Sequence, residues 1–90
     1  MKYARAHLIV NVKDISFNYF AKEKSKHLSL KGWVRSLPSG EAEVVFEGEE
    51  ERIREMVEWC KKGPSLFRDN TVQAEFSDYL GEFEDFEIRH

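Results

Sequence analysis

The order in which two hydrophobic periodicities follow one another along the chain constrains its fold more than any other feature. Apolar, β-branched or alternating runs indicate strands, whereas apolar residues spaced three and four apart indicate helices. Strand-like runs occupy residues 6–12, 30–37, 41–47, 72–76 and 86–88. Helical spacing occupies residues 17–28 and 53–60. The order β-α-β-β-α-β with a tail strand predicts an α+β, ferredoxin-like sandwich, in which both helices cover one face of an antiparallel sheet.

The predicted helices carry end signals as well as apolar faces. Ser16 is a suitable N-cap for the first helix, and Gly63-Pro64 is a stop signal for the second. Three lysines of the first helix, Lys22, Lys24 and Lys26, fall largely off its apolar face and are expected to be solvated. The core-facing positions are Phe17, Ala21, Ser25 and Leu28 in the first helix, and Ile53, Met56, Val57 and Cys60 in the second.

The length and composition exclude several classes of protein. Ninety residues, of which 41% are hydrophobic and 34% charged, predict one globular domain over residues 1–90. Cys60 is the only cysteine, which rules out a disulfide framework and a multi-cysteine zinc site, and the three histidines have no metal-ligand spacing. The apolar run at residues 8–10 is too short for a signal or membrane segment, so we expect a cytoplasmic protein with no membrane contact.

The charge is unevenly distributed along the chain. Residues 1–35 contain eight Lys or Arg and two acidic residues, whereas residues 36–90 contain six Lys or Arg and fifteen acidic residues. A basic first third could attract a small anion such as phosphate, or a nucleic acid. The alternative is that the two halves of one small globule attract each other.

Four blocks in fixed register give the chain a family resemblance. The blocks are residues 32–35 (Gly-Trp-Val-Arg), 37–40 (Leu-Pro-x-Gly), 46–48 (Phe-Glu-Gly) and 59–64 (Trp-Cys-x-x-Gly-Pro). Together they resemble the acylphosphatase family, with ungapped spacing from about residue 5 to residue 88. The resemblance implies the same ferredoxin-like fold, and hydrolysis of acyl phosphates with neither a metal nor an organic cofactor.

The resemblance also implies where the substrate would bind. The first loop of the family resembles Gly-Arg-Val-Gln-Gly-Val-Gly-Phe-Arg, and its backbone N–H groups hold the phosphate at a helix N-terminus. Its final arginine binds the phosphoryl oxygens, and an asparagine directly after Gly-Trp-Val-Arg orients the attacking water. The equivalent phosphate-loop residues of this chain are Lys13, Asp14, Ile15, Ser16 and Phe17.

The chain departs from the family pattern at both catalytic positions. Asn18 stands where the family has its arginine, and Ser36 stands where it has its asparagine. The three glycines of the loop motif are replaced by Val10, Asp14 and Ser16. Loss of one well-placed oxyanion donor costs about 2.7–4 kcal/mol, and the change from arginine to Asn18 also removes a charge. Asp14 adds a negative charge that would repel an anion.

These substitutions predict a non-catalytic binding or interaction module that has lost efficient acyl phosphate hydrolysis. The alternative is a functional acylphosphatase that produces carboxylate and phosphate by direct attack of water. A third hypothesis is an anion receptor or enzyme of different specificity on the same scaffold, which uses Lys13 and the basic first third of the chain. A small anion or an acyl phosphate is a possible partner of the chain, and the natural partner of an interaction module stays open.

The remaining aromatic and thiol residues suggest packing rather than chemistry. Exposed aromatics beside lysines could stack on bases, but the chain has no Lys/Arg-Gly-Phe-x-Phe run and a net charge of −3, which disfavours nucleic-acid binding. Trp33 and Trp59 are expected to pack, and Cys60 is expected to be a small buried hydrophobe. His7 could point to the open face of the sheet. Residues 79–83 are predicted to pack locally or contact a partner, and the aromatics permit self-association without requiring it.

Overall fold

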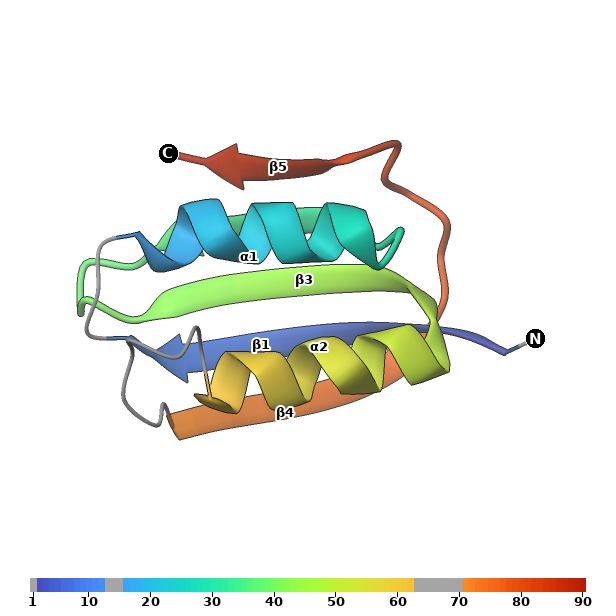
Figure 1. Ribbon diagram of the computed structural model, residues 1–90, viewed down its shortest axis with the longest axis horizontal. Helices are drawn as coiled ribbons and strands as arrows, with labels where there is room; N and C mark the ends of the chain where they lie inside the picture. The colour runs from blue at the N-terminus through green and yellow to red at the C-terminus, as the bar shows by residue number, and fades with distance from the viewer. Residues whose placement is uncertain (1, 13–15, 63–70) are drawn as a thin grey trace.

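The computed structural model describes residues 2–12, 16–62 and 71–90, which form one sheet covered by two helices (Figure 1). The elements are β1 (Tyr3–Asn11), α1 (Phe17–His27), β2 (Lys31–Ser36), β3 (Ala42–Glu49), α2 (Glu50–Lys62), β4 (Thr71–Asp78) and β5 (Phe86–Arg89). The sheet has the strand order β4-β1-β3-β2-β5, and both helices lie on the same face (Figure 1). The predicted ferredoxin-like α+β sandwich is confirmed.

The sheet is mixed rather than wholly antiparallel as predicted. β1 pairs antiparallel with β3 and β4, and β2 pairs antiparallel with β3. β5 instead pairs parallel with β2, with Gly32 opposite Phe86 and Arg35 opposite Arg89. After β4 the chain crosses to the other edge of the sheet and reverses, so the tail strand runs in the same direction as its neighbour (Figure 1).

The core lies between the helices and the alternate residues of the strands that face them. The predicted apolar faces of α1 and α2 are confirmed, since all their core-facing residues are buried. Side chains that alternate with exposed residues supply the sheet side of the core. These buried strand residues include Ala6, Leu8, Val10, Val34, Val44, Phe46 and Phe86.

The last long strand is more exposed than the sequence predicts. The alternation of Val72, Ala74 and Phe76 predicts a half-buried strand. In the structure, however, Ala74 is exposed and Phe76 is 40% exposed. β4 is an edge strand, so it has a neighbour on one side only. The Arg54 guanidinium of α2 lies over the Phe76 ring, 5.3 Å from its centroid, and gives the ring a partial cover.

A buried carboxylate holds the connection between β4 and β5. Glu47 of β3 is 2% exposed and accepts backbone hydrogen bonds from Leu80 (2.8 Å), Gly81 (3.2 Å) and Glu82 (3.0 Å). The Arg5 guanidinium lies 3.4 Å from Glu47 and 2.8 Å from Glu82, and it covers the ring of Phe83. The segment 79–83 therefore packs locally, which was one of its two predicted roles.

Candidate functional site

The two positions at which the chain departs from the catalytic pattern lie in contact at one end of the sheet. The Asn18 Nδ2 group donates a hydrogen bond of 3.0 Å to Ser36 Oγ. Asn18 is half-buried in the first turn of α1, and Ser36 is the exposed last residue of β2. Packing of α1 across β2 brings together these side chains, which are 18 residues apart in sequence.

The turn after β2 fixes the position of Ser36. Leu37 N donates to Glu41 O at 2.7 Å, and Gly40 N donates to Leu37 O at 2.9 Å. Ser36 is paired with Ala42 across the hairpin, and Ala42 is completely buried. β2 and β3 thus form an antiparallel hairpin, which presents the Ser36 hydroxyl at the end of the strand where α1 begins.

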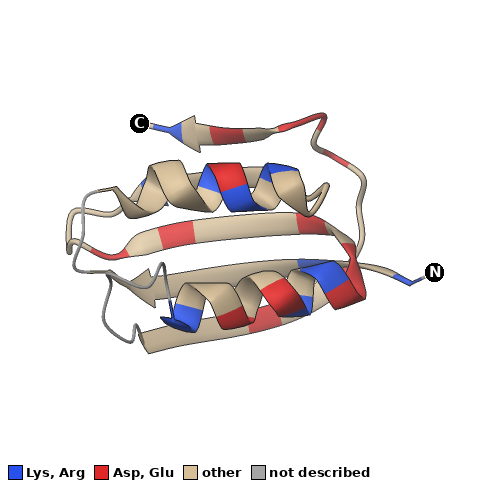
Figure 2. Ribbon diagram, in the orientation of Figure 1, with Lys and Arg blue, Asp and Glu red and all other residues tan. Residues whose placement is uncertain are grey.

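The first turn of α1 is suited to an anion. Its first backbone hydrogen bond runs from Phe20 N to Ser16 O, so the amides of Phe17, Asn18 and Tyr19 precede the intrahelical ladder. No acidic residue lies in this turn, and the Ser16 side chain makes no capping hydrogen bond to the helix. In Figure 2 the first turn of α1 carries no Asp or Glu. The positive end of the helix dipole therefore meets no acidic side chain from its own first turn.

Aromatic packing anchors the start of α1. Phe17 is buried, and its ring centroid lies 5.7 Å from that of Trp59 near the end of α2. This contact confirms the predicted packing role of Trp59. It fixes the first turn of α1, and with it Asn18, against the second helix.

Part of the predicted phosphate loop falls outside the described residues. Lys13, Asp14 and Ile15 belong to this part, whereas Ser16 and Phe17 are described at the start of α1. The described site therefore consists of Ser16 at the N-cap position of α1, Phe17 and Asn18 in its first turn, and Ser36 from the sheet.

Sequence reasoning missed one basic residue beside this site. Lys22 is expected from its sequence position to be solvated, but its side chain is half-buried. Lys22 lies four residues after Asn18, so both residues are on the same side of α1. The sequence spacing alone indicates that Lys22 is near Asn18, because residues at i and i+4 of a helix are neighbours in space.

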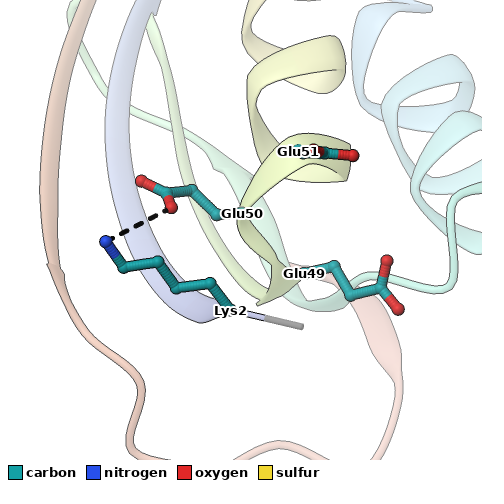
Figure 3. A pocket seen from close by; sticks show the side chains of 4 residues that line it. All are labelled: Lys2, Glu49, Glu50 and Glu51. Carbon is teal, nitrogen blue, oxygen red and sulfur yellow. Dashed lines mark ion pairs between the residues drawn. The ribbon is translucent and has the colours of Figure 1, made fainter.

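The opposite end of the sheet has the wrong charge for an anion. A hollow of about 310 Å³ there is lined by Lys2, Glu49, Glu50 and Glu51, and Lys2 pairs with Glu50 at 3.9 Å (Figure 3). Figure 2 shows acidic residues gathered where β3 passes into α2. Three carboxylates against one ammonium would repel a phosphate group.

On the open face of the sheet, polar and charged side chains pair with one another. His7 Nε2 lies 2.7 Å from one Glu43 oxygen, and Arg35 binds the other Glu43 oxygen at 2.6 Å. The guanidiniums of Arg35 and Arg89 lie 5.4 Å and 4.9 Å from the Trp33 ring centroid. The predicted outward position of His7 and the sheet-face packing of Trp33 are both confirmed.

Two kinds of site are absent from the described residues. Among residues 2–12, 16–62 and 71–90, no group of three His, Cys, Asp or Glu side chains could hold a metal ion. In the same part of the chain, neither helix combines the length and apolar character needed to cross a membrane.

Comparisons with known proteins give a consistent result. The family model described as acylphosphatase matches residues 7–88. An acylphosphatase of Syntrophobacter fumaroxidans is 41% identical over 90 residues, covering 98% of this chain and 93% of its own length. An acylphosphatase of Pelotomaculum thermopropionicum is 38% identical and covers 98% of both chains. The crystal structure of acylphosphatase from Bacillus subtilis superposes with a TM-score of 0.87 at 26% identity, covering 97% of this chain and 99% of the other.

These comparisons overturn the interpretation of the chain as a non-catalytic binding module. That prediction was wrong because relatives at 41% and 38% identity over nearly the full length carry the name acylphosphatase, which favours the alternative of a functional enzyme. The physical reason is that Asn18 and Ser36 account for only two side chains of the site. The backbone amides at the start of α1 do not depend on the identity of those side chains.

Proposed function

The chain belongs to the acylphosphatase family, and on this premise we propose that it hydrolyses acyl phosphates to a carboxylate and phosphate. The observation that carries the proposal is the 3.0 Å hydrogen bond from Asn18 to Ser36 beside the first turn of α1. It joins two polar side chains to a helix end that favours an anion, at an exposed edge of the molecule.

The proposed reaction is a direct displacement at phosphorus. The oxygen of a water molecule forms a bond to phosphorus while the bond between phosphorus and the bridging oxygen breaks. The electron pair of the broken bond leaves with the carboxylate, and one proton of the water passes to a phosphoryl oxygen. The products are the carboxylate and dihydrogen phosphate, and the proposed reaction needs no metal, redox partner or organic cofactor.

The described side chains suggest a division of roles. The amides at the start of α1 hold phosphoryl oxygens, because an N–H group that precedes the helical ladder needs an external acceptor. An asparagine amide has two N–H donors and one carbonyl acceptor. One N–H of Asn18 goes to Ser36, so we assign the second to a phosphoryl oxygen and the carbonyl oxygen to the attacking water. The Ser36 hydroxyl is then a second group that positions the water.

The domain extent, the compartment and the expected anion of the chain agree with this proposal. We take residues 1–90 as one acylphosphatase-like domain, supported by the family match over residues 7–88. We assign it to the cytoplasm, supported by its single cysteine, Cys60, which is buried and forms no disulfide. The small anion expected from the sequence is then the acyl phosphate itself, or the product phosphate.

The test is hydrolysis of benzoyl phosphate by the purified full chain, followed by the release of inorganic phosphate. We expect turnover above the buffer rate. Asn18→Ala and Ser36→Ala should each lower kcat/KM by about 10- to 100-fold, because each removes one positioning group. Ser39→Ala is the matched control, since Ser39 is an exposed serine in the neighbouring turn that binds Glu41. A wild-type rate equal to that of buffer would contradict the proposed function.

A further inference from the structure

An acyl phosphate brings to this site a negative charge that the neutral pair cannot balance. The substrate carries about two negative charges at neutral pH, and more charge develops on the leaving carboxylate during hydrolysis. Asn18 and Ser36 are both uncharged. Fixed positive groups aimed at developing charge are commonly the largest single contribution to catalysis, so a cation beside these side chains would have a large effect.

Lys22 is placed to supply that cation. It lies four residues after Asn18 within α1, where the Cβ atoms of such pairs are about 5–6 Å apart. Long side chains in a helix lean towards the N-terminus, so the Lys22 side chain is expected to extend towards the turn that contains Asn18. A lysine side chain is long enough to reach a phosphoryl group held by the first turn of α1.

The surroundings of Lys22 leave its ammonium available for an external anion. Its side chain is half-buried, yet within residues 2–12, 16–62 and 71–90 no carboxylate lies within 4.0 Å of it. Lys24 of the same helix, by contrast, pairs with Glu55 at 3.6 Å, and Lys61 of α2 pairs with Glu58 at 3.5 Å. A lysine ammonium that reaches a helix N-terminus is stabilised by an anion that binds there.

We propose that Lys22 contacts the phosphoryl oxygens of the bound acyl phosphate and supplies positive charge to the transition state. The inference rests on the proposed function, because it names a further residue of the same site. Lys26 cannot take this role, since it is exposed and lies eight residues, or about 12 Å along the helix, from Asn18.

The test compares three variants of the full chain on benzoyl phosphate, each checked for an unchanged thermal transition. We expect Lys22→Gln to lower kcat/KM by about 10- to 100-fold, because it removes the charge while keeping a polar side chain of similar length. Lys22→Arg should retain activity within about fivefold, since it keeps the charge. Lys26→Gln, the matched control on the same helix, should stay within twofold of wild type. Equal rates for Lys22→Gln and Lys26→Gln would overturn the inference.

Binding of inorganic phosphate gives a readout that is independent of turnover. We expect phosphate to raise the Tm of the wild type and of Lys26→Gln, and to raise that of Lys22→Gln by less than half as much. An inactive wild type would refute the proposed function alone, and the phosphate shifts would then decide whether Lys22 holds an anion. An active wild type with identical phosphate shifts and rates for Lys22→Gln would refute the role of Lys22 alone.

Discussion

Glu47 is the residue whose replacement tests the fold most sharply. Its carboxylate is 2% exposed, and all of its described partners are donors: three backbone amides and the Arg5 guanidinium. Glu47→Gln keeps the shape but turns one acceptor oxygen into a donor NH₂ group. If the NH₂ group takes the Oε1 position, the amide of Glu82 faces another donor. In the other orientation, the amides of Leu80 and Gly81 do so.

The expected loss follows from the number of hydrogen bonds affected. A hydrogen bond to a charged group contributes about 1.5–3 kcal/mol, against about 0.5–1.5 kcal/mol for a neutral one. The substitution removes at least one charged bond and weakens the others, so Glu47→Gln should lower the free energy of unfolding by about 3 kcal/mol. For a domain of this size, that lowers Tm by at least about 10 °C.

The assay is urea unfolding of the wild type, Glu47→Gln and a matched control. Glu75→Gln is the control, because Glu75 is exposed on β4, and it should change the free energy of unfolding by less than about 0.5 kcal/mol. Amide hydrogen exchange should accelerate at Leu80, Gly81 and Glu82 in Glu47→Gln. A difference between the two variants below about 0.5 kcal/mol would refute the stabilising role of this carboxylate.

The contribution of Glu47 also depends on pH in a defined direction. Burial raises the pKa of Glu47, but hydrogen bonds from the amides of Leu80, Glu82 and Gly81 and the charge of Arg5 outweigh burial, so its pKa lies below the ordinary 4.5. A group with a lowered folded pKa stabilises the fold fully above its unfolded pKa and loses that contribution as the pH falls through the folded value. The stability gap between wild type and Glu47→Gln should therefore be constant at neutral pH and shrink below about pH 4.5.

Three further predictions concern the backbone, the thiol and the site. Gly32→Ala should lower the free energy of unfolding by about 4 kcal/mol or more, because an added Cβ at φ +142° would lie 1.8 Å from the carbonyl oxygen of Val45. Gly40→Ala should lower it by only about 1 kcal/mol, since nothing lies within 4 Å of the added Cβ. Urea unfolding of both variants measures the difference. Burial raises the pKa of the Cys60 thiol, so a disulfide reagent at pH 8 should react with it only after unfolding, and rapid labelling of the native protein would contradict this. Asn18→Arg should raise kcat/KM on benzoyl phosphate by about tenfold or more, because the forked cation that it adds beside Ser36 outweighs the loss of the Asn18 carbonyl, whose water-positioning role Ser36 shares. An unchanged or lower rate would show that charge does not limit turnover.

The sequence indicates candidate residues for the site but not how they are arranged. The resemblance to a family marked Asn18 and Ser36 because both fall at fixed positions in a motif register. The hydrogen bond between them depends on how α1 crosses β2, which no local pattern encodes. The same substitutions favour the wrong functional interpretation, because they change two side chains but not the backbone amides at the start of α1.

The positions of the helices and strands, and the buried faces of the two helices, follow from the local sequence pattern alone. Those properties follow from periodicities over a few residues, such as the spacing of Ile53, Met56 and Cys60. Contacts between distant segments set the parallel pairing of β5 with β2, the burial of Glu47 beneath Leu80–Glu82 and the half-buried position of Lys22. Each of these depends on which distant segments become neighbours, and the local alternation of apolar and polar residues is the same whichever neighbour a segment acquires.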